Sequence, residues 1–412
     1  MASVSPDTGG GDLPDSRYAW CRLWIALGLA TIGGIGLWSV VVALPAIEAE
    51  FGVDRGSASI PYFATMIGFA TGGVLMGHLT DKMGVRTPVI LGSISISLGY
   101  ILASQATSMW QFILAQALLI GMFGSSATFG PLVADVTLWF VKRRGIAVAI
   151  VASGNYLAGT IWPPLLQYAI DAFGWRMAHL GIGVFCLVAM LPLALALGKQ
   201  TVSEETDVLA ASRNLIAKMQ MSPSKVQALI VIAGFACCMA MAMPQVHIVA
   251  YCGDLGYGVA RGAEMLSLML GFGIVSRLVS GWIADRIGGL RTLLLGSSLQ
   301  CLALLFYIPF DGLTSLYIVS ALFGLSQGGI VPSYALIVRE YFPAREAGAR
   351  VSLVLMVTIA GMAVGGWMSG EIYDLTGSYQ MAFLNGIAWN LLNMSIAFWL
   401  LAGRQKSTTA TA

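Results

Sequence analysis

The chain has 412 residues, of which 57% are hydrophobic and only 10% are charged, and its mean hydropathy is +0.80. A soluble domain carries about 25% charged residues, so this composition excludes an ordinary soluble domain and predicts that lipid surrounds most of the chain. The net charge of +2 gives no reason to expect a nucleic-acid partner.

Apolar runs predict how the chain crosses the membrane. A membrane-spanning helix needs about 20 mainly apolar residues, and twelve such runs can be counted, six in each half of the chain. They cover residues 23–47, 58–77, 87–104, 111–134, 146–166, 178–198, 226–250, 265–284, 292–310, 316–337, 348–370 and 380–402. The predicted organisation is a tail over 1–21, a six-helix bundle over 22–198, a linker over 199–225, a second bundle over 226–402 and a tail over 403–412. The predicted fold class is therefore an all-α membrane protein.

Lysine and arginine are distributed unevenly over the predicted loops. Cytoplasmic loops carry an excess of both, and with the N-terminus inside, 18 of the 22 fall in inner segments, whereas Arg55, Arg176 and Arg261 lie in outer loops. Both tails and the linker are therefore expected on the cytoplasmic side of a plasma (inner) membrane. The remaining cation, Arg277, falls inside a span.

Arg277 is the most informative polar residue within a span. It precedes Asp285 by eight residues, which places it roughly 12 Å in from the inner end of its helix. An arginine at that depth costs about 2.5–3.5 kcal/mol on insertion scales. A structural ion pair or a side chain that reaches back to the interface are the ordinary explanations. No acidic residue is obviously at the same level, so we expect Arg277 to bind an anion, and its planar fork suits a carboxylate.

The motif Gly-x-x-x-Asp-[Lys/Arg]-x-Gly occurs twice, at 77–84 and 204 residues later at 281–288. Both copies fall between apolar runs, and this doubled motif resembles the signature of the major facilitator superfamily. The resemblance implies two pseudo-symmetric six-helix bundles that form a transporter, with a cytoplasmic gate of charge pairs. Asp81, Arg86 and Asp135 with Arg143 would form one lock, and Asp285 with Arg286 and Arg339 the other. The alternative is that these charges only set topology.

A second run, Trp-Phe-x-x-Arg-Arg-Gly-x-Ala at 139–147, is followed by Ala-Ser-Gly-Asn at 152–155. It resembles the fifth-helix region of monocarboxylate porters and their oxalate/formate relatives. In that family an arginine of the eighth helix binds the substrate carboxylate, which implies the same role for Arg277. Animal members place an aspartate four residues before that arginine, where this chain has Gly273, so any proton acceptor must lie elsewhere.

Four further polar residues are candidates for the substrate site. His247 lies within the predicted span 226–250, and an unperturbed imidazole titrates near neutral pH. It could equally be a hydrogen-bonded structural residue. Asn155, Gln327 and Tyr334 lie on helices that resemble pore-lining elements of the family. We therefore expect Arg277, His247, Asn155, Tyr334 and Gln327 to bind substrate, with Arg277 and His247 carrying the proton coupling.

The predicted function is secondary active transport of a small monocarboxylate of the lactate or pyruvate type, in symport with a proton. Residues 351–370 contain no second cation, which favours a substrate with one negative charge. An organic-anion antiporter of the oxalate/formate type, or a facilitator of another small solute, stays open.

The histidines fall at separate levels and the six cysteines show no metal-ligand spacing, so neither an enzyme, a metal site nor a cofactor is expected. We expect a functional monomer whose partners are the anion, a proton and the bilayer.

Overall fold

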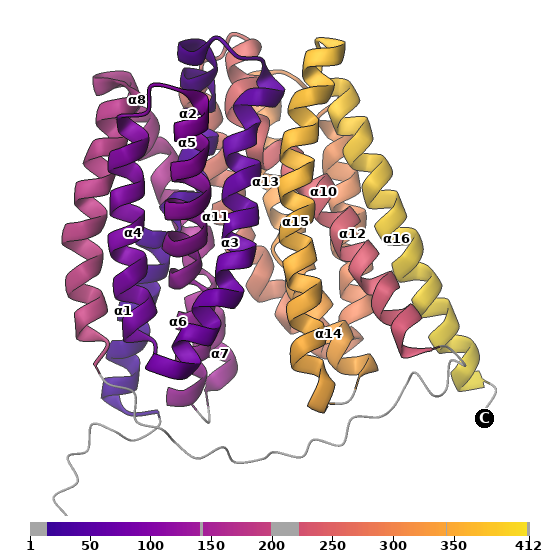
Figure 1. Ribbon diagram of the computed structural model, residues 1–412. Helices are drawn as coiled ribbons and strands as arrows, with labels where there is room; N and C mark the ends of the chain where they lie inside the picture. The colour runs from indigo at the N-terminus through magenta and orange to yellow at the C-terminus, as the bar shows by residue number, and fades with distance from the viewer. Residues whose placement is uncertain (1–14, 141–142, 199–221, 343, 410–412) are drawn as a thin grey trace, which may run out of the picture.

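The computed structural model describes residues 15–140, 143–198, 222–342 and 344–409. Within these ranges every regular element is a helix (Figure 1). Most of the predicted linker (199–221) and the outer parts of both predicted tails lie outside the described residues.

The helices of the first half follow the predicted spans closely. Their bounds are α1 Arg17–Gly33, α2 Ile35–Phe51, α3 Arg55–Met83, α4 Arg86–Ser104, α5 Met109–Leu114, the π-helix η1 Ala115–Gly124, the 3₁₀-helix η2 Ser125–Thr128, α6 Gly130–Trp139, α7 Arg144–Ala152 and α8 Gly154–Ala196. The second half contains α10 Pro223–Asp254, α11 Val259–Ile287, α12 Gly289–Phe306, α13 Leu313–Gln327, α14 Ile330–Tyr341, α15 Ala344–Thr376 and α16 Tyr379–Thr409.

Eleven apolar helical stretches in the described residues are long enough to cross a membrane. The longest, Ile146–Ala196, contains a break at Gly174, where φ is 79° and ψ is 157°. This left-handed conformation suits glycine, and the chain reverses there, because Gly154 packs on Ala30 whereas Gly198 comes back to Tyr18 near the start of α1. The stretch is therefore two spans, and the predicted twelve-helix fold in two bundles is confirmed.

The two bundles lie side by side, the first on the left and the second on the right of Figure 1. We call the end at which α1 begins and α16 ends the lower end, and the opposite one the upper end. The bundles meet through α3 against α15 and α8 against α11. At the upper end this contact is tight: a Cβ on Gly366 would lie 2.8 Å from the Tyr62 ring, and one on Gly370 would lie 2.9 Å from the carbonyl oxygen of Arg55. In the lower part of α3, a Cβ on Gly77 would meet no atom within 4 Å.

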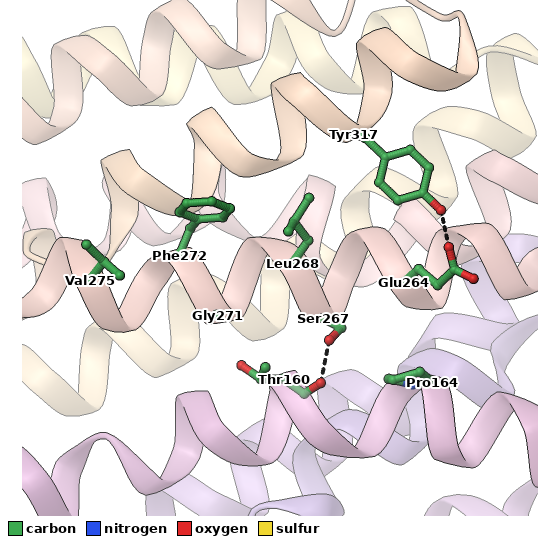
Figure 2. A pocket seen from close by; sticks show the side chains of 9 residues that line it. All are labelled: Thr160, Pro164, Glu264, Ser267, Leu268, Gly271, Phe272, Val275 and Tyr317. Carbon is green, nitrogen blue, oxygen red and sulfur yellow. Dashed lines mark hydrogen bonds between the residues drawn. The ribbon is translucent and has the colours of Figure 1, made fainter.

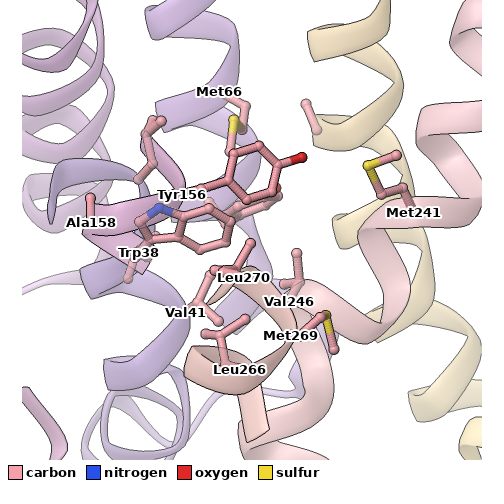
Figure 3. Packing of buried hydrophobic residues seen from close by; sticks show 14 of the residues in the cluster. Trp38, Val41, Met66, Tyr156, Ala158, Met241, Val246, Leu266, Met269 and Leu270 are labelled. Atoms are coloured by element: carbon pink, nitrogen blue, oxygen red, sulfur yellow. The ribbon is translucent and has the colours of Figure 1, made fainter. Parts of the chain in front are cut away.

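The contact between the bundles is apolar at mid-height. Trp38, Val41 and Met66 come from the first bundle, and Val246, Met269 and Leu270 from the second, and all are buried (Figure 3). This layer lies above the level of Arg277 on α11. The structure therefore closes the path between the bundles from the upper end.

Candidate functional site

Arg277 lies between the two bundles and has no carboxylate partner among the described residues. Its Nη1 donates to the carbonyl of Ala152 at 3.0 Å, and its Nε donates to the carbonyl of Gly328 at 3.4 Å. The guanidinium carbon is 4.4 Å from the centre of the Tyr156 ring. Neutral acceptors and an aromatic face hold the side chain in place without cancelling its charge. An anion could therefore bind here as the missing counter-charge.

Tyr156 is a contact of Arg277 that the sequence did not single out. A Cβ on Gly273, one helical turn before Arg277, would lie 2.5 Å from the Tyr156 ring. The glycine thus makes the space that lets a ring from the first bundle reach the guanidinium. The position at which the animal porters carry an aspartate is occupied here by the edge of an aromatic ring.

Asn155 and Gln327 lie next to residues that contact Arg277. Asn155 precedes Tyr156 and accepts from Trp38 Nε1 through its backbone and its side-chain oxygen, each at 3.2 Å. Gln327 precedes Gly328 and accepts a hydrogen bond from Gln245. The Oε1 of Gln245 and the Nε2 of Gln327 are buried without a partner. Unsatisfied buried amides are costly, so this pair offers hydrogen-bonding groups to a ligand close to Arg277.

The fourth span is irregular where it passes Asn155. It continues as a π-helix and then a 3₁₀ turn, in which Ser125 donates to the carbonyl of Gly33 at 2.9 Å and Thr128 to the carbonyl of Ser125 at 2.9 Å. Helical irregularities of this kind are frequent at functional sites. Ser125, Thr128 and Asn155 line a cavity of about 10 Å³ within the first bundle, room for about one water molecule.

Tyr334 points away from Arg277. Its hydroxyl donates to the carbonyl of Ala233 at 2.9 Å and to Asn393 Oδ1 at 2.7 Å, and the residue is fully buried within the second bundle. Its predicted place beside the substrate is not found in this conformation, because α10 and α16 occupy the space around its hydroxyl.

His247 lies near the upper end, apart from Arg277. It is seven residues before the end of α10, whereas Arg277 is 18 residues below the start of α11, so their levels differ by roughly 17 Å along the helices. The Nε2 of His247 lies 2.7 Å from the carbonyl oxygen of Gly366, and Nδ1 lies 3.1 Å from the Tyr379 hydroxyl. The structure therefore does not bring His247 and Arg277 into one site.

The predicted lower gate is not assembled in this conformation. Asp135 pairs with Arg22, with oxygen–nitrogen distances of 2.7 and 2.8 Å, and both side chains are buried. The predicted partner Arg143 instead lies over Trp20, at 5.9 Å from its ring. This corrects the partner of Asp135: α1 passes beside α6 and supplies the nearer arginine. The other members form no ion pair within the described part of the chain, and they are Asp81, Arg86, Asp285, Arg286 and Arg339.

A lateral groove of about 480 Å³ runs between α8 and α11 (Figure 2). Leu268, Phe272 and Val275 line it, and the Tyr317 hydroxyl donates to Glu264 at one end. The same two helices expose Leu165 and Leu278. Because Arg277 does not line this groove and most of its wall surface is apolar, we interpret the groove as lipid-facing surface.

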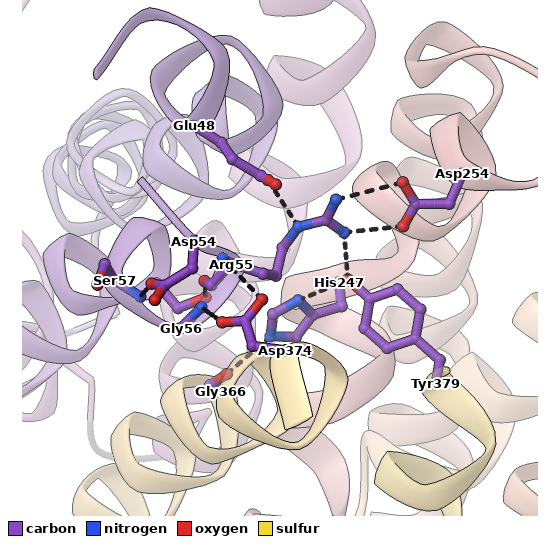
Figure 4. A network of polar contacts seen from close by, with 11 residues as sticks. Glu48, Asp54, Arg55, Gly56, Ser57, His247, Asp254, Gly366, Asp374 and Tyr379 are labelled. Atoms are coloured by element: carbon purple, nitrogen blue, oxygen red, sulfur yellow. Dashed lines mark hydrogen bonds and ion pairs between the residues drawn. The ribbon is translucent and has the colours of Figure 1, made fainter. Parts of the chain in front are cut away.

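Arg55 is the centre of a polar cluster at the upper end (Figure 4). Its Nε donates to Glu48 at 2.6 Å, Nη1 and Nη2 donate to Asp254 at 2.9 and 3.2 Å, and Nη1 also donates to the Tyr379 hydroxyl at 2.5 Å. Asp374 accepts from the backbone N–H groups of Arg55 and Gly56 at 3.0 and 2.5 Å. We call this set the Arg55 cluster, and its members are Glu48, Arg55, His247, Asp254, Asp374 and Tyr379.

Sequence reasoning did not find the Arg55 cluster. Arg55 was counted only as a loop cation, and apart from Glu48, seven residues before it on α2, its partners come from three helices that are distant in the sequence. One signal was available: Glu48, Asp254 and Asp374 each lie near the outer end of a predicted span, at the same membrane face as Arg55.

Comparison with known proteins decides the family. Residues 26–318 match the family model of the Major Facilitator Superfamily. The chain belongs to this superfamily. It is thus a multi-pass membrane transporter and not an enzyme, as the doubled motif predicted.

The relatives of this transporter divide into two kinds. Monocarboxylate transporter 13 of Rattus norvegicus is 27% identical over 401 residues, covering 94% of this chain and 90% of the relative. The agnestins efflux protein AgnL12 of Paecilomyces divaricatus is 24% identical over 409 residues, covering 97% and 91%. The predicted likeness to the monocarboxylate porters is confirmed, but the cargo differs between the relatives.

Solved structures share the fold of this transporter. The nucleoside transporter NupG superposes with a TM-score of 0.74 at 13% identity, covering 93% of this chain and 99% of NupG. A bacterial homologue of the human lysosomal transporter Spinster gives 0.65 at 14% identity, covering 96% and 97%. At these identities the likeness concerns the fold alone.

Proposed function

We propose that this transporter moves a small monocarboxylate across the plasma (inner) membrane, together with a proton, by rocking the two bundles about Arg277. The observation that carries the proposal is the guanidinium of Arg277, which bridges the bundles and finds only carbonyl oxygens and a ring among the described residues. A bound carboxylate would supply the counter-charge and accept a forked pair of hydrogen bonds.

The proposed orientation places the lower end, with both chain termini, in the cytoplasm. The excess of lysine and arginine in the segments at that end supports it. In this orientation the structure is closed toward the outside. Asp81 and Asp285 are proposed to find their cationic partners when the lower end closes, while Asp135 keeps Arg22.

Anion and proton are proposed to bind at separate places. Among the residues that the structure describes, Arg277 has no acidic neighbour that could exchange a proton with the substrate, and Gly273 stands where the animal porters carry an aspartate. His247 is the proposed proton-binding group, roughly 17 Å from the level of Arg277. Asn155, Gln327 and Tyr156 are proposed to complete the anion site.

The second candidate function is export of an organic anion by exchange or facilitated movement. The fungal efflux relative, which covers 97% of this chain, favours it. In either case the same arginine would bind the anion, so the two candidates differ in coupling and direction.

Transport into proteoliposomes tests the proposal. Labelled mono- and dicarboxylates are offered with and without an inward proton gradient, to the wild type, to Arg277→Ala and to the control Arg261→Ala. Arg261 is on the same helix but exposed at its upper end, so its loss removes an equal charge away from the site.

We expect the gradient to drive accumulation of a monocarboxylate by the wild type and by Arg261→Ala, and Arg277→Ala to abolish it. Carboxylate uptake by Arg277→Ala at the wild-type rate would contradict the proposed site. Uptake that requires a carboxylate inside the vesicles, and no gradient, would favour the exchanger.

A further inference from the structure

The Arg55 cluster joins the two bundles around a buried arginine whose carboxylate partners, Glu48 and Asp254, are partly exposed, at 25% and 32%. Glu48 and Arg55 belong to the first bundle, and Asp254, Asp374 and Tyr379 to the second. The Arg55 side chain is 7% exposed, and its guanidinium also lies 4.7 Å from the Tyr373 ring. Removing one partner from a buried ion pair is strongly destabilising, so the closed upper end depends on Arg55 keeping its partners.

Asp374 adds a second tie of another kind. Its carboxylate accepts from the first two backbone N–H groups of α3, which have no partner within that helix. A negative charge at a helix N-terminus is favourable. The start of α3 is thus held by α15 of the other bundle, and the bundles cannot part at this end without exposing these groups.

His247 is joined to Arg55 through the Tyr379 hydroxyl, and the directions of the hydrogen bonds indicate a neutral His247 imidazole. The carbonyl oxygen of Gly366 can only accept, so Nε2 carries a hydrogen. The Tyr379 oxygen accepts from Arg55 Nη1, which leaves its own hydrogen free to be donated to Nδ1 of His247. The chain of donors therefore runs from Arg55 through Tyr379 to a neutral imidazole and on to Gly366.

A proton on Nδ1 would break this chain. The imidazolium would need an acceptor for Nδ1–H, and the group that Nδ1 meets is the Tyr379 oxygen, which already accepts from Arg55 Nη1. The charged and titratable groups that face the imidazole region are Arg55 from α3, Glu48 from α2, Asp254 and Tyr251 from α10, Tyr373 and Asp374 from α15, and Tyr379 from α16. A bond from Nδ1–H to this oxygen reverses the hydrogen bond between Tyr379 and His247 and places a second positive charge beside the oxygen that Arg55 already uses.

We propose that the Arg55 cluster is the outer gate of this transporter and that His247 is its proton-operated switch, closed when the imidazole is neutral and released when a proton binds Nδ1. The proposal rests on the proposed function for its orientation and its transport cycle. A proton that binds the open state better than the closed state shifts the population toward opening. Acid outside would then favour opening of the substrate site toward the outside, without any need for a carboxylate beside Arg277.

The test measures the distance across the upper end in the absence of cargo. Spin labels are placed on Ser57→Cys in α3 and on Leu375→Cys in α15, with the exposed Cys21 replaced by serine. The distance between the two labels is measured by pulsed electron–electron double resonance in liposomes from pH 8 to pH 5. Leu375 is 84% exposed, so the label should not disturb the packing. We expect one short distance at pH 8 and a growing population of a longer distance as the pH falls. Because one proton is exchanged, the open-to-closed ratio rises by at most about tenfold per pH unit.

Two substitutions separate the switch from the gate. In His247→Gln the amide oxygen can accept from Tyr379 and the amide nitrogen can donate to Gly366, without a titratable group, so the upper end should stay closed at every pH. Arg55→Ala should give the long distance at every pH. His179→Gln is the matched control: this second buried histidine bonds only to Trp175 in its own bundle and should leave the response unchanged.

A wild-type pH response in His247→Gln, or a closed upper end in Arg55→Ala, would overturn the proposal. If Arg55→Ala does not fold, Glu48→Gln removes one of the charged partners and should raise the open population, and an unchanged ratio would contradict the gate. These measurements need no substrate, so they stand or fall independently of Arg277. Loss of the anion site with an intact pH response would refute only the proposed cargo.

Discussion

Two arginines of this transporter show how the chain uses charge in different ways. Arg55 at the upper end has two carboxylate partners and a tyrosine, and it joins bundles that are closed around it. Arg277 at mid-height also reaches from one bundle to the other, but only carbonyl oxygens and a ring meet it among the described residues. A charge that is satisfied within the chain stabilises a conformation, whereas one that is not is available to a ligand.

Arg22 is a third arginine for this comparison, and its charge is compensated by a carboxylate of its own bundle. It pairs with Asp135 at 2.7 Å, and both side chains are buried. Arg22→Ala leaves a buried carboxylate without its partner, which should cost about 3–5 kcal/mol of stability. We expect the midpoint temperature of thermal unfolding of the detergent-solubilised protein, measured by tryptophan fluorescence, to fall clearly.

The double substitution Arg22→Met with Asp135→Leu is the control for that prediction. Replacing a buried ion pair by apolar residues of similar volume is often neutral, so the double variant should recover most of the lost stability. A double variant as unstable as Arg22→Ala would show that the pair is needed for more than charge compensation.

Arg277→Lys tests the other side of the comparison. A lysine keeps the charge but loses the planar fork, so it cannot hold two carbonyl groups and a carboxylate in the same geometry. The loss of one charged hydrogen bond, about 1.5–3 kcal/mol, should weaken substrate binding by about 10- to 150-fold. Competition by unlabelled substrate in proteoliposomes measures this, with Arg261→Lys as control. An unchanged affinity would mean that a point charge is enough.

The fold could be predicted from sequence because its signals are local. Each span is an apolar run, and the doubled motif at 77–84 and 281–288 indicates two related bundles. Even the reversal at Gly174 was implied, because the predicted spans 146–166 and 178–198 stop on either side of it. Lipid imposes these patterns on the chain residue by residue.

The site could be predicted only in part, because contacts between bundles have no local signature. Arg277 is singled out by its depth, which a helix rise of about 1.5 Å per residue supplies, and its role as the anion site stays a prediction. Tyr156 was missed, because its relation to Arg277 depends on Gly273 being small. Tyr334 was misplaced, because sequence does not tell which side of α14 faces the other bundle.

Gly273→Ala tests whether the ring beneath Arg277 matters. Its Cβ would lie 2.5 Å from the Tyr156 ring, so the ring must move and the cation–π contact is lost. Such a contact is worth about 0.5–2 kcal/mol, which predicts an affinity about 2- to 30-fold weaker. Gly271→Ala is the matched control, because its Cβ would find an ordinary distance of 3.5 Å to Thr160.

A double-mutant cycle distinguishes this effect from general misfit. If Gly273→Ala acts through the ring, it should cause no further loss of affinity in a Tyr156→Ala background. Additive losses would mean that the alanine disturbs Arg277 by another route.

The smallest expected effect concerns Tyr334, which lies on a helix assigned to the pore but donates its hydrogen bonds within its own bundle. Tyr334→Phe removes bonds to Ala233 and Asn393 and should lower stability by about 1 kcal/mol while leaving substrate affinity unchanged. Gln327→Leu, next to Gly328, should instead weaken substrate binding and leave stability unchanged, because it removes an amide near Arg277. If Tyr334→Phe instead weakened binding, α14 would have to turn its tyrosine toward the path when the bundles move, and the division between satisfied and available polar groups would hold only for this conformation.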